Sequence, residues 1–148
     1  MRVNAYAAPA AGEPLAPTTI ERREVGANDV LIEIAFAGIC HSDIHTVQGD
    51  WGPQQYPLAP GHEIVGTVAE IGSDVTRHAV GDLVGVGCMV NSCGECASCT
   101  GGDEQFCVKG MVGTYGATDR DGTVTQGGYS THVVVDAGFV LSVPDGID

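Results

Sequence analysis

The chain has 148 residues, and 43% of them are hydrophobic, which is enough to build the core of one domain. Its formal net charge of −13 argues against nucleic acid or an anionic membrane as a partner, because both attract basic surfaces. We find no apolar run long enough to span a membrane and no signal peptide. Six cysteines without a secretory signal predict a cytoplasmic protein with reduced thiols.

The first half of the chain has a mostly β pattern. We expect strands over 2–8, 15–25 and 29–37, and the last is the clearest because apolar residues alternate along it. The polar segment 40–48 is expected to form one or two helical turns. Residues 49–61 contain three prolines and three glycines, which predicts a loop.

The second half continues with short strands, expected over 63–71, 82–87, 129–136 and 139–143. Gly66 lies inside the first of these and indicates a bulge or a close backbone approach. No βαβ unit and no G-x-G-x-x-G between a strand and a helix is found. The pattern therefore predicts a mainly β fold with short helices, as a barrel or a sandwich.

A run of four cysteines with the spacing C-x2-C-x2-C-x7-C is the most specific signal. The run comprises Cys93, Cys96, Cys99 and Cys107. Four thiolates this close suit a closed tetrahedral site of the kind that zinc prefers. The residues between them lack apolar periodicity, so metal binding would be coupled to their folding. Two disulfides or an iron–sulfur cluster remain as alternatives.

A second group of potential ligands lies upstream, with Cys40 at the end of an apolar strand and His62-Glu63 about twenty residues later. A thiolate, an imidazole and a carboxylate with one open position are typical of catalytic zinc. Taken alone the group is weak, since such a cysteine or histidine is often an ordinary core residue. Cys88, the remaining cysteine, lies in an apolar stretch and is expected to be buried and inert.

The order of these motifs resembles the N-terminal catalytic domain of zinc-dependent medium-chain alcohol dehydrogenases. The motifs are GICHSD at 38–43, GHE at 61–63 followed by Gly66 and Gly72, and then the four cysteines. Trp51 and the sequence around the cysteines look closest to the cinnamyl-alcohol-dehydrogenase-like aldehyde reductases. The resemblance implies that residues 1–148 form a GroES-like, partly open β-barrel, and that the cofactor-binding Rossmann domain is absent from this chain.

The resemblance also implies an activity. The intact enzyme would interconvert alcohols with aldehydes or ketones by zinc-assisted hydride transfer, using NADP or NAD, and would be a homo-oligomer acting on a small molecule. The isolated chain is expected to be inactive. A polyol, threonine or formaldehyde dehydrogenase of the same architecture is an alternative, and so is a non-catalytic zinc-stabilised β-barrel module.

Residue roles follow from the resemblance by position. Cys40 and His62 would bind the catalytic zinc with Glu63 as a near or alternative ligand, while a third protein ligand, a cysteine, would lie just past residue 148. Asp43 would accept the other ring N–H of His62. Ser42 would accept the proton of the substrate, and His45 would transfer it to solvent. His41 would contact the pyrophosphate of the cofactor, and Trp51 would form part of the wall of the substrate pocket. The four-cysteine zinc would be structural.

Simpler interpretations remain for several of these residues. Ser42 could cap the short helix, His45 could be an exposed helix residue, and Glu63 could be a strand-edge carboxylate. Trp51 could serve packing alone. His78 and His132 match no motif and are expected to be ordinary surface or strand residues.

Overall fold

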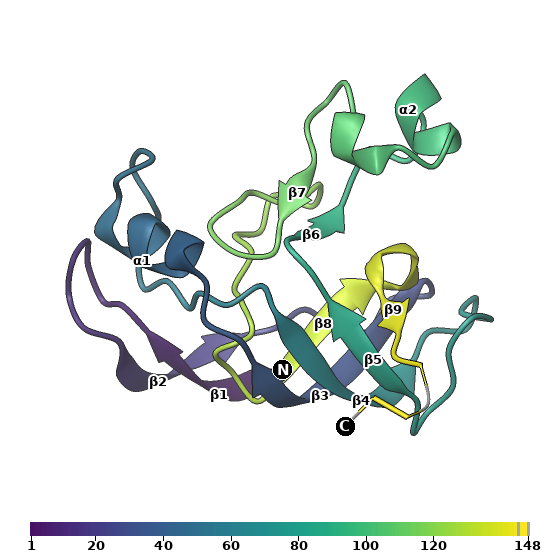
Figure 1. The fold of residues 1–148 in the computed structure, drawn as a ribbon, viewed down its shortest axis with the longest axis horizontal. Coiled ribbons are helices and arrows are strands. Elements are labelled where there is room, and N and C mark those ends of the chain that lie inside the picture. Colours follow the sequence, from purple (N-terminus) through teal and green to yellow (C-terminus); the bar gives the residue numbers. More distant parts are fainter. Residues whose placement is uncertain (145, 148) are drawn as a thin grey trace.

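The computed structural model describes residues 1–144, 146 and 147, which form short strands and helices (Figure 1). The strands are β1 (Arg2–Ala7), β2 (Ala16–Glu21), β3 (Asp29–Ala37), β4 (Ile64–Ile71), β5 (Leu83–Val86), β6 (Met89–Asn91), β7 (Val112–Gly113), β8 (His132–Asp136) and β9 (Leu141–Ser142). The helices are α1 (His41–Gln48) and α2 (Ala97–Thr100), with 3-10 turns at Glu104–Phe106 and Ala137–Phe139. None of the helices in this part of the chain has the length and apolar character needed to cross a membrane.

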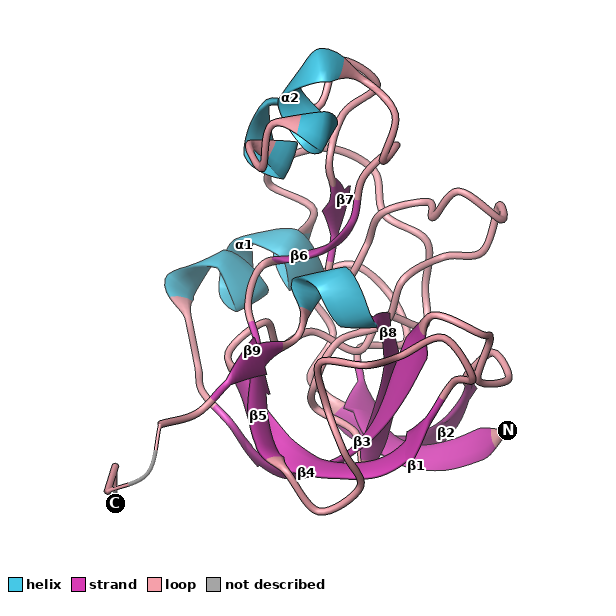
Figure 2. Cartoon of the chain, turned by 90° about the vertical axis from the view of Figure 1, so that its right-hand side faces the viewer, coloured by secondary structure: helices cyan, strands magenta, loops and turns pink. Residues whose placement is uncertain are grey.

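The largest sheet has the strand order β8-β3-β4-β5-β9, and β1-β2 and β6-β7 form two smaller sheets. Every pairing between the described strands is antiparallel. Figure 2 shows the large sheet curving into an open half-barrel with both helices on its open side. Because β8 and β9 lie at opposite edges and do not pair with each other in the described structure, the barrel stays open. The predicted mainly β, partly open barrel is confirmed.

The core consists of β-branched residues that alternate along neighbouring strands. Val30 and Ile32 of β3 are fully buried, and Ile32 lies opposite Val68 of β4. Val84 of β5 and Val135 of β8 belong to the same buried cluster. Burying one such side chain contributes about 1.5–3 kcal/mol. The alternation therefore fixes which face of the sheet is buried.

Most elements expected from the sequence are confirmed within one or two residues, including β1, β3, α1, β4 and β5. The strand expected over 129–136 begins only at His132, because Tyr129 and Thr131 instead hydrogen-bond to the backbone of Tyr6 and Asn4 in β1. The two-residue strand β7 and the three-residue strand β6 were not predicted. They are too short to show an alternating pattern.

Arg22, just after β2, ties the amino-terminal sheet to the far end of the chain. Its guanidinium donates to the backbone oxygens of His132, Gln126 and Gly127 and to the Ser130 hydroxyl. Burial lowers the pKa of Arg22 to about 10, so it stays charged at neutral pH. The strand expected over 15–25 therefore ends early, since Arg22 turns inward as an anchor.

The close backbone approach expected at Gly66 is present. Gly66 lies opposite Ile34, beside a register shift in the pairing of β3 with β4. An added Cβ would lie 2.2 Å from the backbone oxygen of Glu33. Only a residue without a side chain allows β3 and β4 to pack at this point.

We expect Gly66→Ala to lower the free energy of unfolding by about 2 kcal/mol, because the new methyl group must push two strands apart. Urea denaturation followed by circular dichroism measures this. Gly87→Ala is the matched control, because a Cβ at Gly87 would meet no heavy atom within 4 Å. Equal unfolding midpoints for the two variants would contradict the assigned packing role.

Candidate functional site

Cys40, His62 and Glu63 come together from two loops, one after the end of β3 and one before the start of β4. Cys40 follows β3 and immediately precedes α1, and His62-Glu63 immediately precede β4. One ligand atom from each of the three lies within 4.8 Å of the others. The backbone N–H of Gly38 donates to the Glu63 carbonyl at 2.8 Å, which joins the two loops. One sulfur, one nitrogen and one carboxylate oxygen fit the ligand preferences of a catalytic zinc ion.

The helix α1 carries four of the predicted side chains past this group: His41, Ser42, Asp43 and His45. Ser42 Oγ lies 3.5 Å from Cys40 Sγ. The rings of His41 and His45 stack with their centroids 4.6 Å apart, and Trp51 lies 5.1 Å from the His45 ring. His45 Nδ1 is 2.8 Å from an Asp50 carboxylate oxygen. The helix therefore presents a hydroxyl near the ligand group and an imidazole farther out, while His41 is exposed.

Asp43 is the buried centre of this arrangement, with 4% of its surface exposed. Its Oδ2 accepts from the backbone N–H of Cys40 at 3.0 Å and from the Tyr129 hydroxyl at 3.0 Å. Its Oδ1 accepts from the backbone N–H of Gly61 at 3.0 Å. Burial, and then the Asp43 carboxylate, raises the pKa of Tyr129, which therefore stays protonated as a donor. One carboxylate thus joins the start of α1, the loop before β4 and the loop before β8.

The contact expected between Asp43 and His62 stays a prediction, and a tyrosine hydroxyl lies closer to the imidazole. His62 Nδ1 lies 3.6 Å from Asp43 Oδ1, which is longer than a hydrogen bond. The same nitrogen lies 3.2 Å from the hydroxyl of Tyr115, whose ring stacks on the imidazole with a centroid distance of 5.6 Å. No sequence motif marked Tyr115, which is 53 residues away in the chain. Burial, and then the Asp43 carboxylate, raises the pKa of Tyr115.

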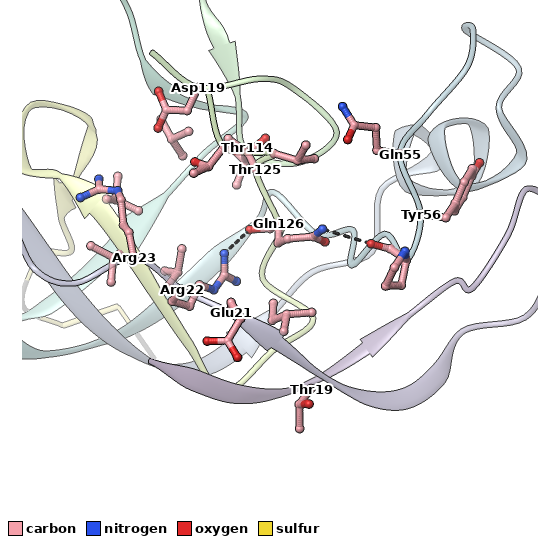
Figure 3. Close-up of a pocket in the computed structure, with 18 residues that line it drawn as sticks. Thr19, Glu21, Arg22, Arg23, Gln55, Tyr56, Thr114, Asp119, Thr125 and Gln126 are labelled. Atoms are coloured by element: carbon pink, nitrogen blue, oxygen red, sulfur yellow. Dashed lines mark hydrogen bonds between the residues drawn. The ribbon is translucent and has the colours of Figure 1, made fainter. Parts of the chain in front are cut away.

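A pocket of about 300 Å³ opens beside these residues and is lined by Ser42, Trp51, His62 and Tyr115. Trp51 remains 64% exposed, so it forms part of the pocket wall without being packed into the core. Its role toward a substrate stays a prediction, as do the roles of Ser42, His45 and His41. A separate pocket of about 630 Å³ lies between β2 and β8, beside Arg22 and Gln126, and contains none of the predicted site residues (Figure 3).

Two expectations about single residues are wrong. Cys88 is exposed and lines the smaller pocket, because β5 ends at Val86 and the chain turns at Gly87 before the buried Val90. His78 is neither a surface nor a strand residue. It is 6% exposed in the turn region before β5, and neither ring nitrogen has a hydrogen-bond partner among the residues that the structure describes. No sequence pattern distinguished it from an ordinary turn histidine.

The four clustered cysteines converge in the lobe that contains α2, which stands away from the large sheet (Figure 1). All four sulfurs lie within 4.8 Å of one another, and Cys99 Sγ is 3.4 Å from Cys96 Sγ and 3.8 Å from Cys93 Sγ. Because Cys99 Sγ approaches two other sulfurs, the arrangement suits one four-sulfur site better than two separate pairs. Backbone N–H groups of Cys99 and Val108 lower the pKa of Cys96 to about 6. A thiolate in this setting fits a tetrahedral zinc site.

The family model for the alcohol dehydrogenase GroES-like domain matches residues 26–145. The chain belongs to this family. It is 61% identical over 146 residues to NADP-dependent alcohol dehydrogenase C 1 of Mycolicibacterium smegmatis, covering 98% of this chain and 42% of that protein. It is 52% identical over 133 residues to cinnamyl alcohol dehydrogenase 8 of Arabidopsis thaliana, covering 90% of this chain and 37% of that protein.

Among solved structures, a CAD from Helicobacter pylori in complex with NADP(H) matches with a TM-score of 0.95 and 43% identity. The match covers all of this chain and 43% of that one. The chain therefore spans about two fifths of the length of these curated relatives. The GroES-like fold inferred from the motifs is confirmed, and so is the alcohol dehydrogenase family.

We expect the purified chain to bind two equivalents of zinc, and Cys99→Ser to bind one, because only the four-cysteine site loses a ligand. Elemental analysis with anomalous scattering at the zinc edge measures both. Cys88→Ser is the control, since this exposed cysteine belongs to neither ligand group, and it should keep two equivalents. Full zinc content in Cys99→Ser would contradict the assignment of the cluster.

We expect Asp43→Ala to lower the free energy of unfolding by about 3 kcal/mol, because three buried or partly buried donors lose their charged acceptor. Differential scanning calorimetry measures this loss. Asp74→Ala removes an exposed carboxylate that accepts only from the neighbouring Ser73 hydroxyl, and it should change stability by less than about 0.5 kcal/mol. A stable Asp43→Ala variant with unchanged zinc content would show that the carboxylate does not organise these loops.

Proposed function

We propose that this chain is the zinc-dependent catalytic domain of an oxidoreductase that interconverts alcohols with aldehydes or ketones by hydride transfer with NADP or NAD. The observation that carries the proposal is the convergence of Cys40, His62 and Glu63 beside a pocket lined by Ser42 and Trp51. A β-barrel module without catalytic activity would need the four-cysteine site alone. It would have no use for a second ligand group beside a pocket.

The relatives support NADP over NAD in this proposal. The Mycolicibacterium relative is named as NADP-dependent, and the Helicobacter CAD was solved with NADP(H). Residues 1–148 would supply the catalytic domain, and the nicotinamide cofactor would be held mainly by sequence that this chain does not contain. The exposed His41 at the start of α1 is the residue of this chain proposed to touch the cofactor pyrophosphate.

When held by Cys40 and His62 with Glu63 alongside, zinc supplies a Lewis acid that polarises the oxygen of an alcohol or carbonyl group. Ser42 Oγ, at the pocket wall, would accept the proton of the substrate hydroxyl and release its own. His45 is half-buried and its Nδ1 is held by Asp50, which leaves the other ring nitrogen to take that proton toward solvent. Trp51 would shield the pocket from water.

The substrate would be a small alcohol or aldehyde, in line with the relatives' names. The net charge of −13 opposes nucleic acid and anionic membranes as partners. Three exposed apolar residues on the lobe of the four cysteines, Phe106, Val108 and Met111, support a homo-oligomeric enzyme. Five cysteines placed in the two ligand groups, where they would bind metal as thiolates, support a reducing cytoplasm as its location.

A chimera tests the activity directly. The matching segment of the Mycolicibacterium NADP-dependent alcohol dehydrogenase C 1 is replaced by this chain. We expect NADP-linked oxidation of primary alcohols and reduction of the aldehydes, measured at 340 nm. Ser42→Ala in the chimera should lower kcat at least about 100-fold, because proton transfer from the substrate loses its acceptor.

Ser73→Ala serves as the control, because this exposed hydroxyl lies outside the pocket, and the variant should keep the kcat of the parent chimera. A folded chimera with two bound zinc ions and no NADP-linked turnover would contradict the proposal. A Ser42→Ala chimera with unchanged kcat would remove Ser42 from the proton path.

A further inference from the structure

Tyr115 contacts the predicted zinc ligand His62 in two ways. Its hydroxyl lies 3.2 Å from His62 Nδ1, and its ring stacks on the imidazole with an interplanar angle of 17°. The residue follows β7, a strand absent from the sequence predictions, and it is half-buried at the pocket wall. An orienting partner of this kind fixes which ring nitrogen of a histidine carries the proton.

The tautomer of His62 decides whether the ring can bind a metal ion. Because Nδ1 is occupied by Tyr115, Nε2 is the nitrogen available to a metal. Nε2 binds a metal only when it is unprotonated, and the neutral ring must then carry its proton on Nδ1. The phenol oxygen must therefore accept from Nδ1, and the phenol proton must point elsewhere.

Asp43 does not take this part itself. Its carboxylate can only accept hydrogen bonds. Asp43 itself already accepts from Cys40, Gly61 and Tyr129, and its Oδ1 is 3.6 Å from His62 Nδ1. The Tyr115 hydroxyl is therefore the closer oxygen to His62 Nδ1, at 3.2 Å against 3.6 Å for Asp43 Oδ1.

We propose that Tyr115 is the positioning residue for His62: its oxygen accepts the Nδ1 proton, and the ring is held with Nε2 free for zinc. This inference rests on the proposed metal site at Cys40, His62 and Glu63. It assigns to the Tyr115 phenol the part that the family resemblance gave to Asp43 alone.

Tyr115→Phe tests the inference, because it removes the hydroxyl and keeps the stacked ring. The first measurement is zinc affinity by competition with a chromophoric chelator. We expect binding at the Cys40 site to weaken about 10-fold, with the four-cysteine site unchanged. Tyr56→Phe is the matched control, because its hydroxyl donates to the Val47 carbonyl, and its zinc affinity should equal that of the unaltered chain.

The second measurement determines directly which nitrogen of the His62 imidazole carries the proton. Nitrogen-15 NMR spectra of the zinc-free chain, labelled at its histidines, report which ring nitrogen carries the proton. The signal that is missing from the spectrum of His62→Gln is the signal of His62. We expect Nδ1–H to predominate in the unaltered chain, and the Tyr115→Phe spectrum to shift toward Nε2–H. The signals of His78 should stay in place, since a loss of fold would move them as well.

The outcomes separate the inference from the function on which it rests. If the unaltered chain binds zinc only at the four cysteines, the proposed metal site fails. If it binds two ions, and Tyr115→Phe matches it in affinity and in the His62 spectrum, the role of Tyr115 is overturned. A shift in the spectrum with a weaker second ion supports the assignment.

Discussion

The buried carboxylate of Asp43 is the interaction on which the candidate site depends. It accepts from Cys40, from Gly61 and from Tyr129, so three segments distant in the sequence meet at one charge. A buried charge is stable only when such donors surround it, and the segments must therefore take these positions for the domain to fold well. Because Cys40 and the neighbour of His62, Gly61, both donate to Asp43, this carboxylate helps to set the distance between Cys40 and His62.

The two ligand groups are built on opposite principles. The cysteine lobe draws all four sulfurs from residues 93–107, so its geometry is local and could be read from spacing alone. The second group joins the end of β3 to the start of β4, and only the folded sheet brings Cys40 to His62. A local, closed set suits a metal that stabilises a loop, and an assembled set beside a pocket suits one that meets a substrate.

The strands and α1 could be predicted because alternation, glycine and proline report local structure. The side chain that contacts His62 could not be predicted, since Tyr115 lies 53 residues away in a loop without periodicity. Cys88 was misjudged because an apolar neighbourhood in the sequence does not show where a strand ends. His78 was missed for the same kind of reason: burial in a turn depends on tertiary packing and leaves no sequence pattern.

The anchor formed by Arg22 has a consequence for how the domain is made. Its guanidinium binds groups 104 to 110 residues farther along the chain. During synthesis on the ribosome, residue 22 has therefore left the exit tunnel long before its acceptors exist. The amino-terminal hairpin of β1 and β2 is synthesised before the segment that it contacts, so the contacts that complete the domain form together and late in folding. A chaperone that shields this hairpin would act over that interval.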